Sequence, residues 1–189
     1  MKNDSQLGFA LLGLIRQQPM SGYDLRKIFT STAMGSFSDS PGAIYPALAR
    51  LEKTGLTGGA VEKSSSLRKR RIFKITPRGA SALKAWMEKP VTRDDVVRNT
   101  ADLMLRFAFM DGMLGAESVI RFLGEFAARI ESYLHELRTY LEAHASKMPL
   151  SGRLALECGI QEYVLRLHWA RTSASLYEKK NEKGKKGRV

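Results

Sequence analysis

The sequence predicts a mainly α-helical protein with one small β-hairpin, organised as two successive domains. Apolar residues recur at helical spacing along most of the 189 residues, whereas strand-like patterning is confined to one stretch around residues 60–75. The charge is divided as well: residues 1–90 hold 15 Lys and Arg against 6 Asp and Glu, and residues 91–177 hold 10 against 11. A basic first half of this kind indicates a polyanionic partner for that half alone.

Two short helices are expected at the start of the chain. The first spans residues 5–17 and ends before Pro19. Its apolar stripe consists of Leu7, Leu11 and Leu14. The second begins at Ser21, where a capping box is available: the Ser21 hydroxyl can accept the Asp24 N–H, and the Asp24 carboxylate reaches back to Ser21. The apolar side of this helix comprises Leu25, Ile28 and Phe29.

A third helix is expected from Ser40 to Thr54, with Gly55 as its C-terminal stop. Its core-facing residues are Ile44, Leu48 and Leu51. The opposite face is small or cationic and comprises Gly42, Ala43, Pro46, Ala49, Arg50 and Lys53, with Tyr45 on the flank. A helix with such a face can lie deep in the major groove of DNA, because little side chain holds it away.

Pro46 weakens the hydrogen-bond pattern of this helix, because proline has no N–H to donate to the Gly42 carbonyl. We therefore expect a loosened or kinked first turn between Gly42 and Pro46. The alternative is that residues 40–42 form a turn and that the helix begins near Tyr45. Either version leaves the same outward face, with Ser40 and the N–H groups of the first turn directed at phosphate.

A β-hairpin and a fourth helix follow. Strands are expected at about 60–63 and 70–75, on either side of a polar tip. Thr76 then caps a helix that starts at Pro77, where the missing N–H costs nothing. Three helices, a hairpin and another helix are the order of a winged helix-turn-helix domain, which we assign to residues 1–90.

The hairpin places positive charge beside the expected recognition helix. Its cations are Arg68, Lys69, Arg70 and Arg71, with Lys63 on the preceding strand. A wing of this kind can enter a minor groove or hold phosphates. The candidate DNA contacts are these cations, Tyr23, Ser40 and the outward face of the third helix. The alternative is that the excess of basic residues serves only solubility.

Residues 91–178 are predicted to form an α-helical domain, with helices at 100–114, 116–146 and 153–177. In the second of these, apolar residues recur in steps of four and three, as in a coiled coil. This seam consists of Val119, Leu123, Phe126, Ile130, Tyr133, Leu137 and Tyr140. We expect it to contact a second copy of the chain; the alternative is that it packs on helices of its own subunit. Residues 179–189 have no apolar side and are expected to form a basic, disordered tail.

Four stretches of the chain resemble the PadR-like transcriptional regulators. They are LGFALLGLI, SGYDLRKIF, SPGAIYPALARLEKTGL and FKITPRGASALKAWM, and they cover most of residues 7–87. One position departs from the family pattern: Phe73 stands where the family tends to have tyrosine in the second wing strand, which removes a hydroxyl group. The helical second half resembles the larger subfamily, which has a C-terminal helical domain.

The resemblance implies a bacterial, cytoplasmic homodimer whose C-terminal helices interlock and which binds a two-fold symmetric operator in double-stranded DNA, as a repressor does. It also implies that some relatives lose DNA affinity when they bind small aromatic acids or hydrophobic drugs. The candidate lining of an effector pocket, between the two halves or at the dimer centre, consists of Trp86, Phe107, Tyr163 and Trp169. The alternative is that these are ordinary core aromatics.

Enzymatic activity is not expected. The three histidines, at positions 135, 144 and 168, belong to no metal or catalytic motif, and the single cysteine, Cys158, excludes a thiolate metal cluster. We expect no cofactor and no metal. We also expect no membrane-spanning helix, because no apolar stretch is long enough to cross a membrane. A competing hypothesis is an architectural or effector-independent DNA-binding or protein-interaction module, which would bind unrelated duplexes nearly as well as an operator.

Overall fold

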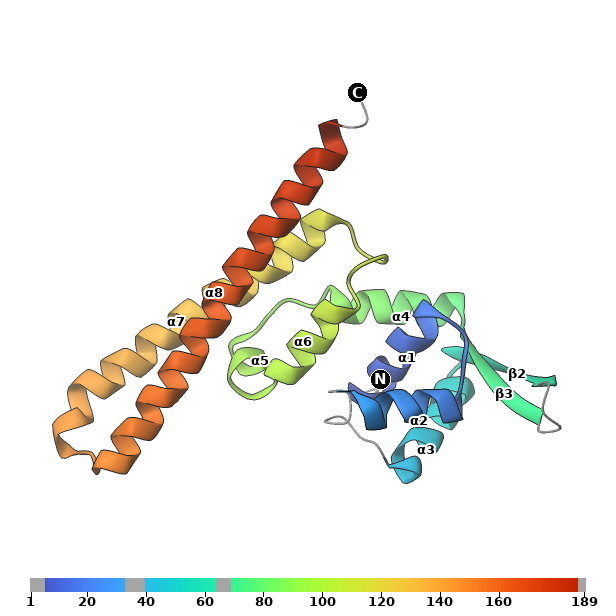
Figure 1. Ribbon diagram of the computed structural model, residues 1–189, viewed down its shortest axis with the longest axis horizontal. Coiled ribbons are helices and arrows are strands. Elements are labelled where there is room, and N and C mark those ends of the chain that lie inside the picture. Colours follow the sequence, from blue (N-terminus) through green and yellow to red (C-terminus); the bar gives the residue numbers. More distant parts are fainter. Residues whose placement is uncertain (1–5, 33–39, 64–68, 187–189) are drawn as a thin grey trace. The chain divides into compact units, whose positions relative to one another are not determined.

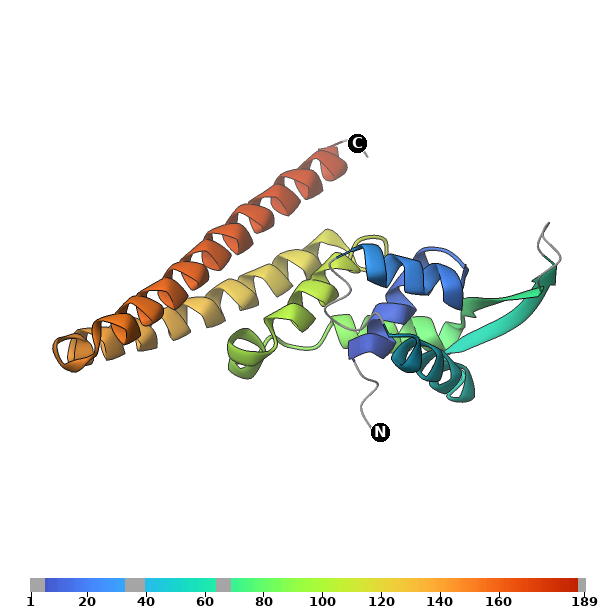
Figure 2. The same ribbon diagram turned by 60° about the horizontal axis from the view of Figure 1, so that its bottom comes forward.

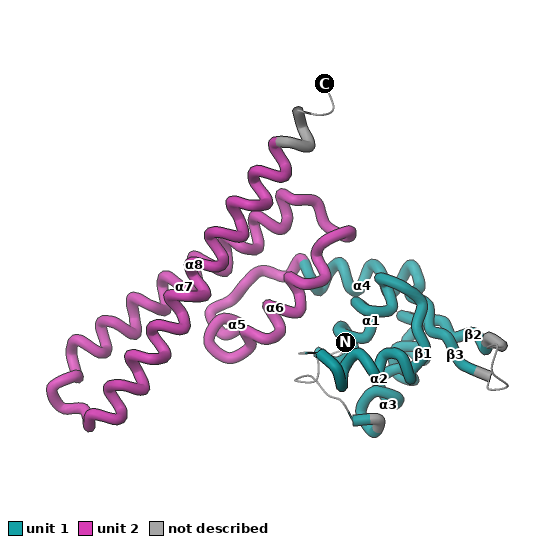
Figure 3. The backbone as a smooth tube through the Cα atoms, in the orientation of Figure 1, with its two compact units in different colours: residues 1–87 teal, residues 88–189 magenta. Residues whose placement is uncertain are grey.

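The computed structural model describes residues 6–32, 40–63 and 69–186, and within these ranges every side chain except those of residues 41, 62, 63, 69 and 183–186. Two compact units are present, residues 1–87 and 88–189 (Figure 3). The described elements (Figure 1) are α1 (Gln6–Gln17), β1 (Met20–Ser21), α2 (Gly22–Ser31), α3 (Pro41–Lys53), β2 (Thr57–Lys63), β3 (Lys69–Ile75), α4 (Pro77–Met87), α5 (Arg93–Arg98), α6 (Thr100–Ala108), α7 (Ala116–His144), η2 (Ala145–Lys147) and α8 (Leu150–Lys186).

The described residues of unit 1 form four helices and an antiparallel sheet in the order β1-β3-β2. The predicted hairpin is confirmed and is longer than expected, with Ala60 paired to Ile72 near its middle. The two-residue strand β1 was not predicted, because two residues are too few to show a strand pattern; it pairs Met20 with Phe73. The fully buried core comprises Leu11, Leu12, Leu25, Phe29, Ile44 and Leu83. This arrangement is a winged helix-turn-helix.

The predicted helix ends of unit 1 are confirmed in detail. The Ser21 hydroxyl accepts the Asp24 N–H at 3.2 Å, and the Asp24 carboxylate accepts the Ser21 N–H at 3.2 Å, which completes the capping box. At the start of α4, the Thr76 hydroxyl accepts the Gly79 N–H at 3.0 Å. After α3, Gly55 has φ 72°, a left-handed conformation that favours glycine.

Helix α3 runs without interruption from Pro41 to Lys53 and passes through Pro46. The alternative start near Tyr45 is therefore wrong. The N–H groups of Ala43 and Ile44 both donate to the Ser40 carbonyl, at 3.0 and 3.1 Å. The first turn is thus tightened by an extra short-range hydrogen bond, and the helix begins where Ser40 caps it.

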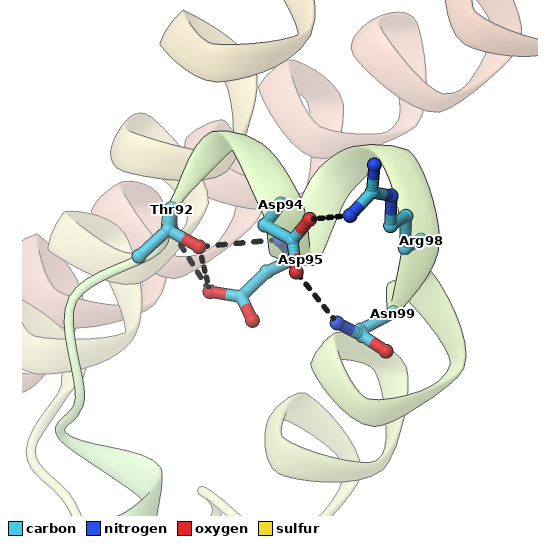
Figure 4. Close-up of polar contacts among 5 residues, drawn as sticks. All are labelled: Thr92, Asp94, Asp95, Arg98 and Asn99. Atoms are coloured by element: carbon cyan, nitrogen blue, oxygen red, sulfur yellow. Dashed lines mark hydrogen bonds and ion pairs between the residues drawn. The ribbon is translucent and has the colours of Figure 1, made fainter.

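Unit 2 begins with a short helix, α5, that was not predicted. Its first turn is fixed by Thr92, whose hydroxyl accepts the Asp95 N–H at 3.2 Å while the Asp95 carboxylate accepts the Thr92 N–H at 2.9 Å (Figure 4). Asp94 pairs with Arg98 one turn later at 3.0 Å. A six-residue helix with one buried residue, Val96, is too short to show a helical period in the sequence.

The longer helices of unit 2 differ from the prediction at their ends. Helix α6 stops at Ala108 rather than residue 114, and the turn after it contains Gly112 with φ 78°. Helices α7 and α8 form an antiparallel hairpin through η2 (Figures 1 and 2). Within the described ranges, no helix has both the length and the apolar character needed to cross a membrane.

The prediction of a disordered tail is wrong for residues 179–186, which are helical. Helix α8 continues through residues 179–186 and ends at Lys186; residues 187–189 lie outside the described part of the chain. Once a helix exists, each further residue adds a hydrogen bond without a new nucleation cost, and lysine and glutamate are good helix formers. An apolar side is therefore not required for this segment to extend the helix.

The predicted contact seam of α7 is buried in its first half and more exposed in its second half. Its first four members, Val119, Leu123, Phe126 and Ile130, are at most 1% exposed and lie in the core of unit 2. Helix α8 of the same chain packs along α7, so these side chains are not available to a second copy. Farther along the seam, Tyr133 and Leu137 are partly exposed and Tyr140 is 52% exposed. The alternative interpretation, packing within the subunit, describes the first half of the seam.

Candidate nucleic-acid interface

The outward face of α3 is exposed as predicted. Tyr45 is 47% exposed, and Gly42, Pro46, Ala49, Arg50 and Lys53 are exposed as well, while Ala43 is partly exposed. The core-facing residues Ile44, Leu48 and Leu51 are at most 2% exposed. The helix therefore presents a surface of short side chains with two cations in its last turn. Such a surface has the shape and charge to enter the major groove of DNA.

Ser40 acts differently from the prediction. Its hydroxyl accepts the Gly42 N–H at 3.2 Å, and its carbonyl accepts the next two N–H groups. These donors of the first turn are therefore engaged within the protein instead of being directed at phosphate. The cause is the sequence itself, since serine is a strong N-cap and the following Pro41 has no N–H.

A second cationic group lies on α2 and the wing. The ring of Tyr23, which is 54% exposed, has the guanidinium carbon of Arg26 at 6.0 Å and that of Arg70 at 5.9 Å from its centroid. We call Tyr23, Arg26 and Arg70 the Tyr23 cluster. Cation–π contacts with an exposed ring hold both guanidinium groups near one point of the surface. The cluster is suited to contact adjacent phosphates from two different elements.

Tyr45 is held in place by its contact with α2. A Cβ atom added at Gly22 would lie 2.6 Å from Tyr45 Cε1 and 3.4 Å from Leu48 Cδ1. Glycine at this position therefore allows the ring of Tyr45 to lie directly against the first turn of α2. This contact orients an exposed aromatic side chain at the edge of the α3 surface.

Arg71 on the wing strand β3 was predicted to contact DNA, but in the structure its charge is paired within the protein. Its guanidinium group is bound to Glu52 of α3, with Nη2 at 2.6 Å from Oε1. The same oxygen accepts the N–H of Gly59 in β2 at 3.0 Å. Arg71 is thus engaged within the protein, because a carboxylate from the recognition helix lies within reach of it. Arg68, and the side chains of Lys63 and Lys69, lie outside the described residues.

Comparison with known proteins relates the half of the chain that carries this surface to a family of regulators. Residues 11–85 match the Transcriptional regulator PadR-like family, and a bacterial relative supports the match along most of the chain. That relative, the negative transcriptional regulator PadR of Bacillus subtilis, is 25% identical over 146 residues, which are 77% of this chain and 79% of the relative. The winged helix-turn-helix half of the chain is therefore similar to the PadR-like family. Members of this family are transcriptional regulators and not enzymes.

Solved structures of PadR-like proteins are similar along nearly the whole chain. A PadR-like regulator from Bacillus cereus is 26% identical, covering 92% of this chain and 99% of its own, with a TM-score of 0.41. PadR of B. subtilis in complex with operator DNA is 21% identical, covering 90% and 98%, with a TM-score of 0.43. The same protein in complex with p-coumaric acid is 19% identical, covering 92% and 99%, with a TM-score of 0.42.

The four residues predicted to line an effector pocket are divided between the units, with Trp86 in unit 1 and the other three in unit 2. Trp86 is 5% exposed and stacks on Phe9 within unit 1, with ring centroids 4.6 Å apart. In unit 2, Phe107 and Trp169 meet edge to face at 5.2 Å. Tyr163 lies instead against Tyr133, at 5.0 Å. Phe107 and Trp169 therefore share a cluster within unit 2, Trp86 packs within unit 1, and a pocket formed by all four residues stays a prediction.

Arg26 and Glu52 are the residues of the candidate interface that sequence analysis missed. Arg26 follows Tyr23 by one helical turn, so the spacing of the two side chains on α2 was a usable signal. Glu52 gave no local signal, because its partners lie 7 and 19 residues farther along the chain. Its role depends on how the wing folds back against α3.

Proposed function

We propose that this chain is a PadR-like, sequence-specific, homodimeric repressor that acts in the bacterial cytoplasm on an inverted-repeat operator. The exposed, short and cationic face of α3 carries the proposal. The Tyr23 cluster adds two cations beside it. The relative of B. subtilis is named a negative regulator, which supports repression. In a symmetric dimer, two α3 helices would enter successive major grooves about one helical turn apart.

Selection of bound duplexes from a random pool, followed by footprinting, tests this proposal. We expect an enriched inverted repeat, protection of both half-sites, and a large preference for this site over an unrelated duplex. Equal affinity for the enriched and the unrelated duplex would instead support the architectural alternative.

Dimerisation is supported by a stripe of exposed residues on α8. The stripe consists of Leu150, Leu154, Cys158, Gln161, Leu165, His168, Thr172 and Leu176, and contains no Asp, Glu, Lys or Arg. Its leucines are 51–68% exposed. Leu154, Leu165 and Leu176 are spaced by 11 residues, which is close to three full turns, so they lie along one side of the helix. We call this set the outer stripe of α8 and propose that a second copy covers it.

Effector response is supported by the aromatic cluster of unit 2. Around the Phe107–Trp169 pair, Phe122 and Tyr177 approach Phe107 at 6.4 and 6.2 Å, and Phe126 approaches Trp169 at 6.3 Å. Both Phe107 and Trp169 are partly exposed. An aromatic acid could stack on this cluster and change how α6 packs on α7 and α8.

The effector proposal is tested with p-coumaric acid, the molecule bound to B. subtilis PadR in one of its structures. A Trp86→Phe variant leaves Trp169 as the single tryptophan. Binding should quench the Trp169 emission and lower the affinity for the selected operator over the same concentration range. Unchanged emission and unchanged affinity over the whole range would contradict the proposal for this acid.

A further inference from the structure

Glu52 joins the recognition helix to both strands of the wing. It lies in the last turn of α3, and one of its carboxylate oxygens accepts two hydrogen bonds. One comes from the Gly59 N–H on β2 at 3.0 Å, and the other from Arg71 on β3 at 2.6 Å. We call Glu52, Gly59 and Arg71 the Glu52 clamp. A single carboxylate therefore fixes both strands relative to the helix that carries the candidate DNA contacts.

The clamp differs from an ordinary surface ion pair, which contributes little to stability. The sheet order β1-β3-β2 places β2 at an edge, where backbone N–H groups lack a strand partner. Glu52 supplies the acceptor for one of them. The Glu52 side chain is 30% exposed and that of Arg71 is 52% exposed. Gly59 provides the space for their contact: an added Cβ would lie 2.7 Å from Glu52 Oε1 and 2.5 Å from Arg71 Nε.

We propose that Glu52 is a positioning residue for operator binding: it sets the pose of the wing against α3 and keeps Arg71 from contacting DNA. This inference rests on the proposed function. A carboxylate on a DNA-facing helix repels phosphate, so its charge alone weakens binding to every duplex. Removal of the charge should therefore weaken operator binding if Glu52 positions the wing, and strengthen it if Glu52 acts only through its charge.

The first test is Glu52→Gln, measured with the selected operator and with an unrelated duplex of the same length. Positioning predicts about tenfold weaker binding to the operator, with equal or stronger binding to the unrelated duplex. The salt dependence should become steeper by about one phosphate contact, because the Arg71 guanidinium loses its charged partner. Glu142→Gln, at an exposed position of α7, makes the same change in net charge and serves as the control. Equal strengthening on both duplexes would overturn the inference.

The second test leaves every charge in place. Gly59→Ala inserts a methyl group between the two charged partners, whereas Gly58→Ala, one residue earlier on the same strand, meets nothing within 4 Å. We expect Gly59→Ala to reduce the preference for the operator about as much as Glu52→Gln, and Gly58→Ala to retain it. Thermal unfolding of each variant checks that unit 1 is folded.

The outcomes separate the two levels of the proposal. If the wild type prefers the operator and both Glu52→Gln and Gly59→Ala retain this preference, the positioning role alone is overturned. A wild-type protein without any operator preference would overturn the proposed function, and the positioning role with it. Loss of preference in both variants, with both controls intact, supports the Glu52 clamp.

Discussion

At Gly79, a hydrogen atom in place of a side chain lets α4 begin directly against the short segment between α3 and β2. A Cβ at this position would lie 2.0 Å from the Leu56 carbonyl oxygen and 2.9 Å from Ile75 Cγ1. The same carbonyl accepts the Thr76 N–H at 3.1 Å. Because the obstructing atom belongs to the backbone, it cannot move aside as a flexible side chain would. The start of α4 and the base of the wing are therefore fixed together.

Replacing Gly79 by alanine should destabilise unit 1 by about 2 kcal/mol or more, because relieving the overlap requires a backbone shift. Gly124→Ala gives the contrast: Gly124 is exposed within α7, and a Cβ there meets nothing within 4 Å. That change should stabilise unit 2 by about 0.5–1 kcal/mol, since alanine is the better helix former. Denaturant unfolding monitored by circular dichroism measures both effects. A Gly79→Ala protein as stable as the wild type would show that α4 can move away freely.

Arg50→Ala tests the candidate interface at one side chain. Arg50 is exposed in the last turn of α3. If it contacts a base edge, its loss should weaken operator binding by about 1–3 kcal/mol and relax the preference at one position of the site. Arg16→Ala, at an exposed position of α1, removes the same charge elsewhere in unit 1. Fluorescence anisotropy with operator variants measures both; equal losses in the two proteins would mean that only net charge matters.

Sequence alone identified the residues whose partners lie nearby in the chain. Ser21 with Asp24 and Thr76 with Gly79 were predictable, because caps act over three residues. Glu52 was not, since its pairing with Arg71 requires β2 and β3 to fold back on α3. For the same reason, sequence counted Arg71 with the other wing cations, although the structure binds it to a carboxylate.

At the scale of elements, the periodicity of α7 predicted that one face is buried but not which element buries it. A repeat of four and three residues requires an apolar partner surface, and a helix of the same chain satisfies it as well as a second copy does. Phe126 and Ile130 are buried beneath the subunit's own helices, whereas Tyr140, near the end of α7, is exposed. The sequence could not separate these cases, because the apolar pattern of α8 is spread over several of its sides.

Helix α6 is expected to make the stability of unit 2 depend on pH. Burial raises the pKa of Asp102, while the nearby guanidinium of Arg106 acts in the opposite direction and does not fully offset it. The folded state therefore binds this proton more tightly than the unfolded state. The resulting stabilisation is complete below the ordinary carboxyl pKa of about 4 and is lost as the pH rises through the folded value.

Asp102→Asn isolates this effect, because asparagine does not titrate. As the pH rises above about 4, the free energy of unfolding of the wild type should fall relative to that of the variant. Unfolding curves collected at a series of pH values give the difference, in which contributions from all other carboxylates cancel. Parallel pH profiles for the two proteins would contradict the raised pKa of Asp102.

At the scale of the whole molecule, the division of charge agrees with a division of labour between the two units. The basic excess of residues 1–90 accompanies the exposed surface of α3 and the Tyr23 cluster. Residues 91–177 are nearly neutral, and there α8 exposes an uncharged stripe instead. An operator with two half-sites needs both surfaces: one to contact each half-site, and the other to join two copies of the chain.

The outer stripe of α8 leads to a prediction for the assembled protein. Wild-type protein at micromolar concentration should have twice the mass of the 21.1 kDa chain by light scattering. Leu154→Glu and Leu165→Glu should each shift the equilibrium toward monomer, because a carboxylate would be buried in the apolar contact between copies. Ala155→Glu adds the same charge at the neighbouring exposed position, off the stripe, and should leave the mass unchanged.

The monomeric variants should protect single half-sites with lower affinity, while thermal unfolding of each chain stays close to that of Ala155→Glu. A dimer that persists in both leucine variants would show that the two copies meet elsewhere on the molecule.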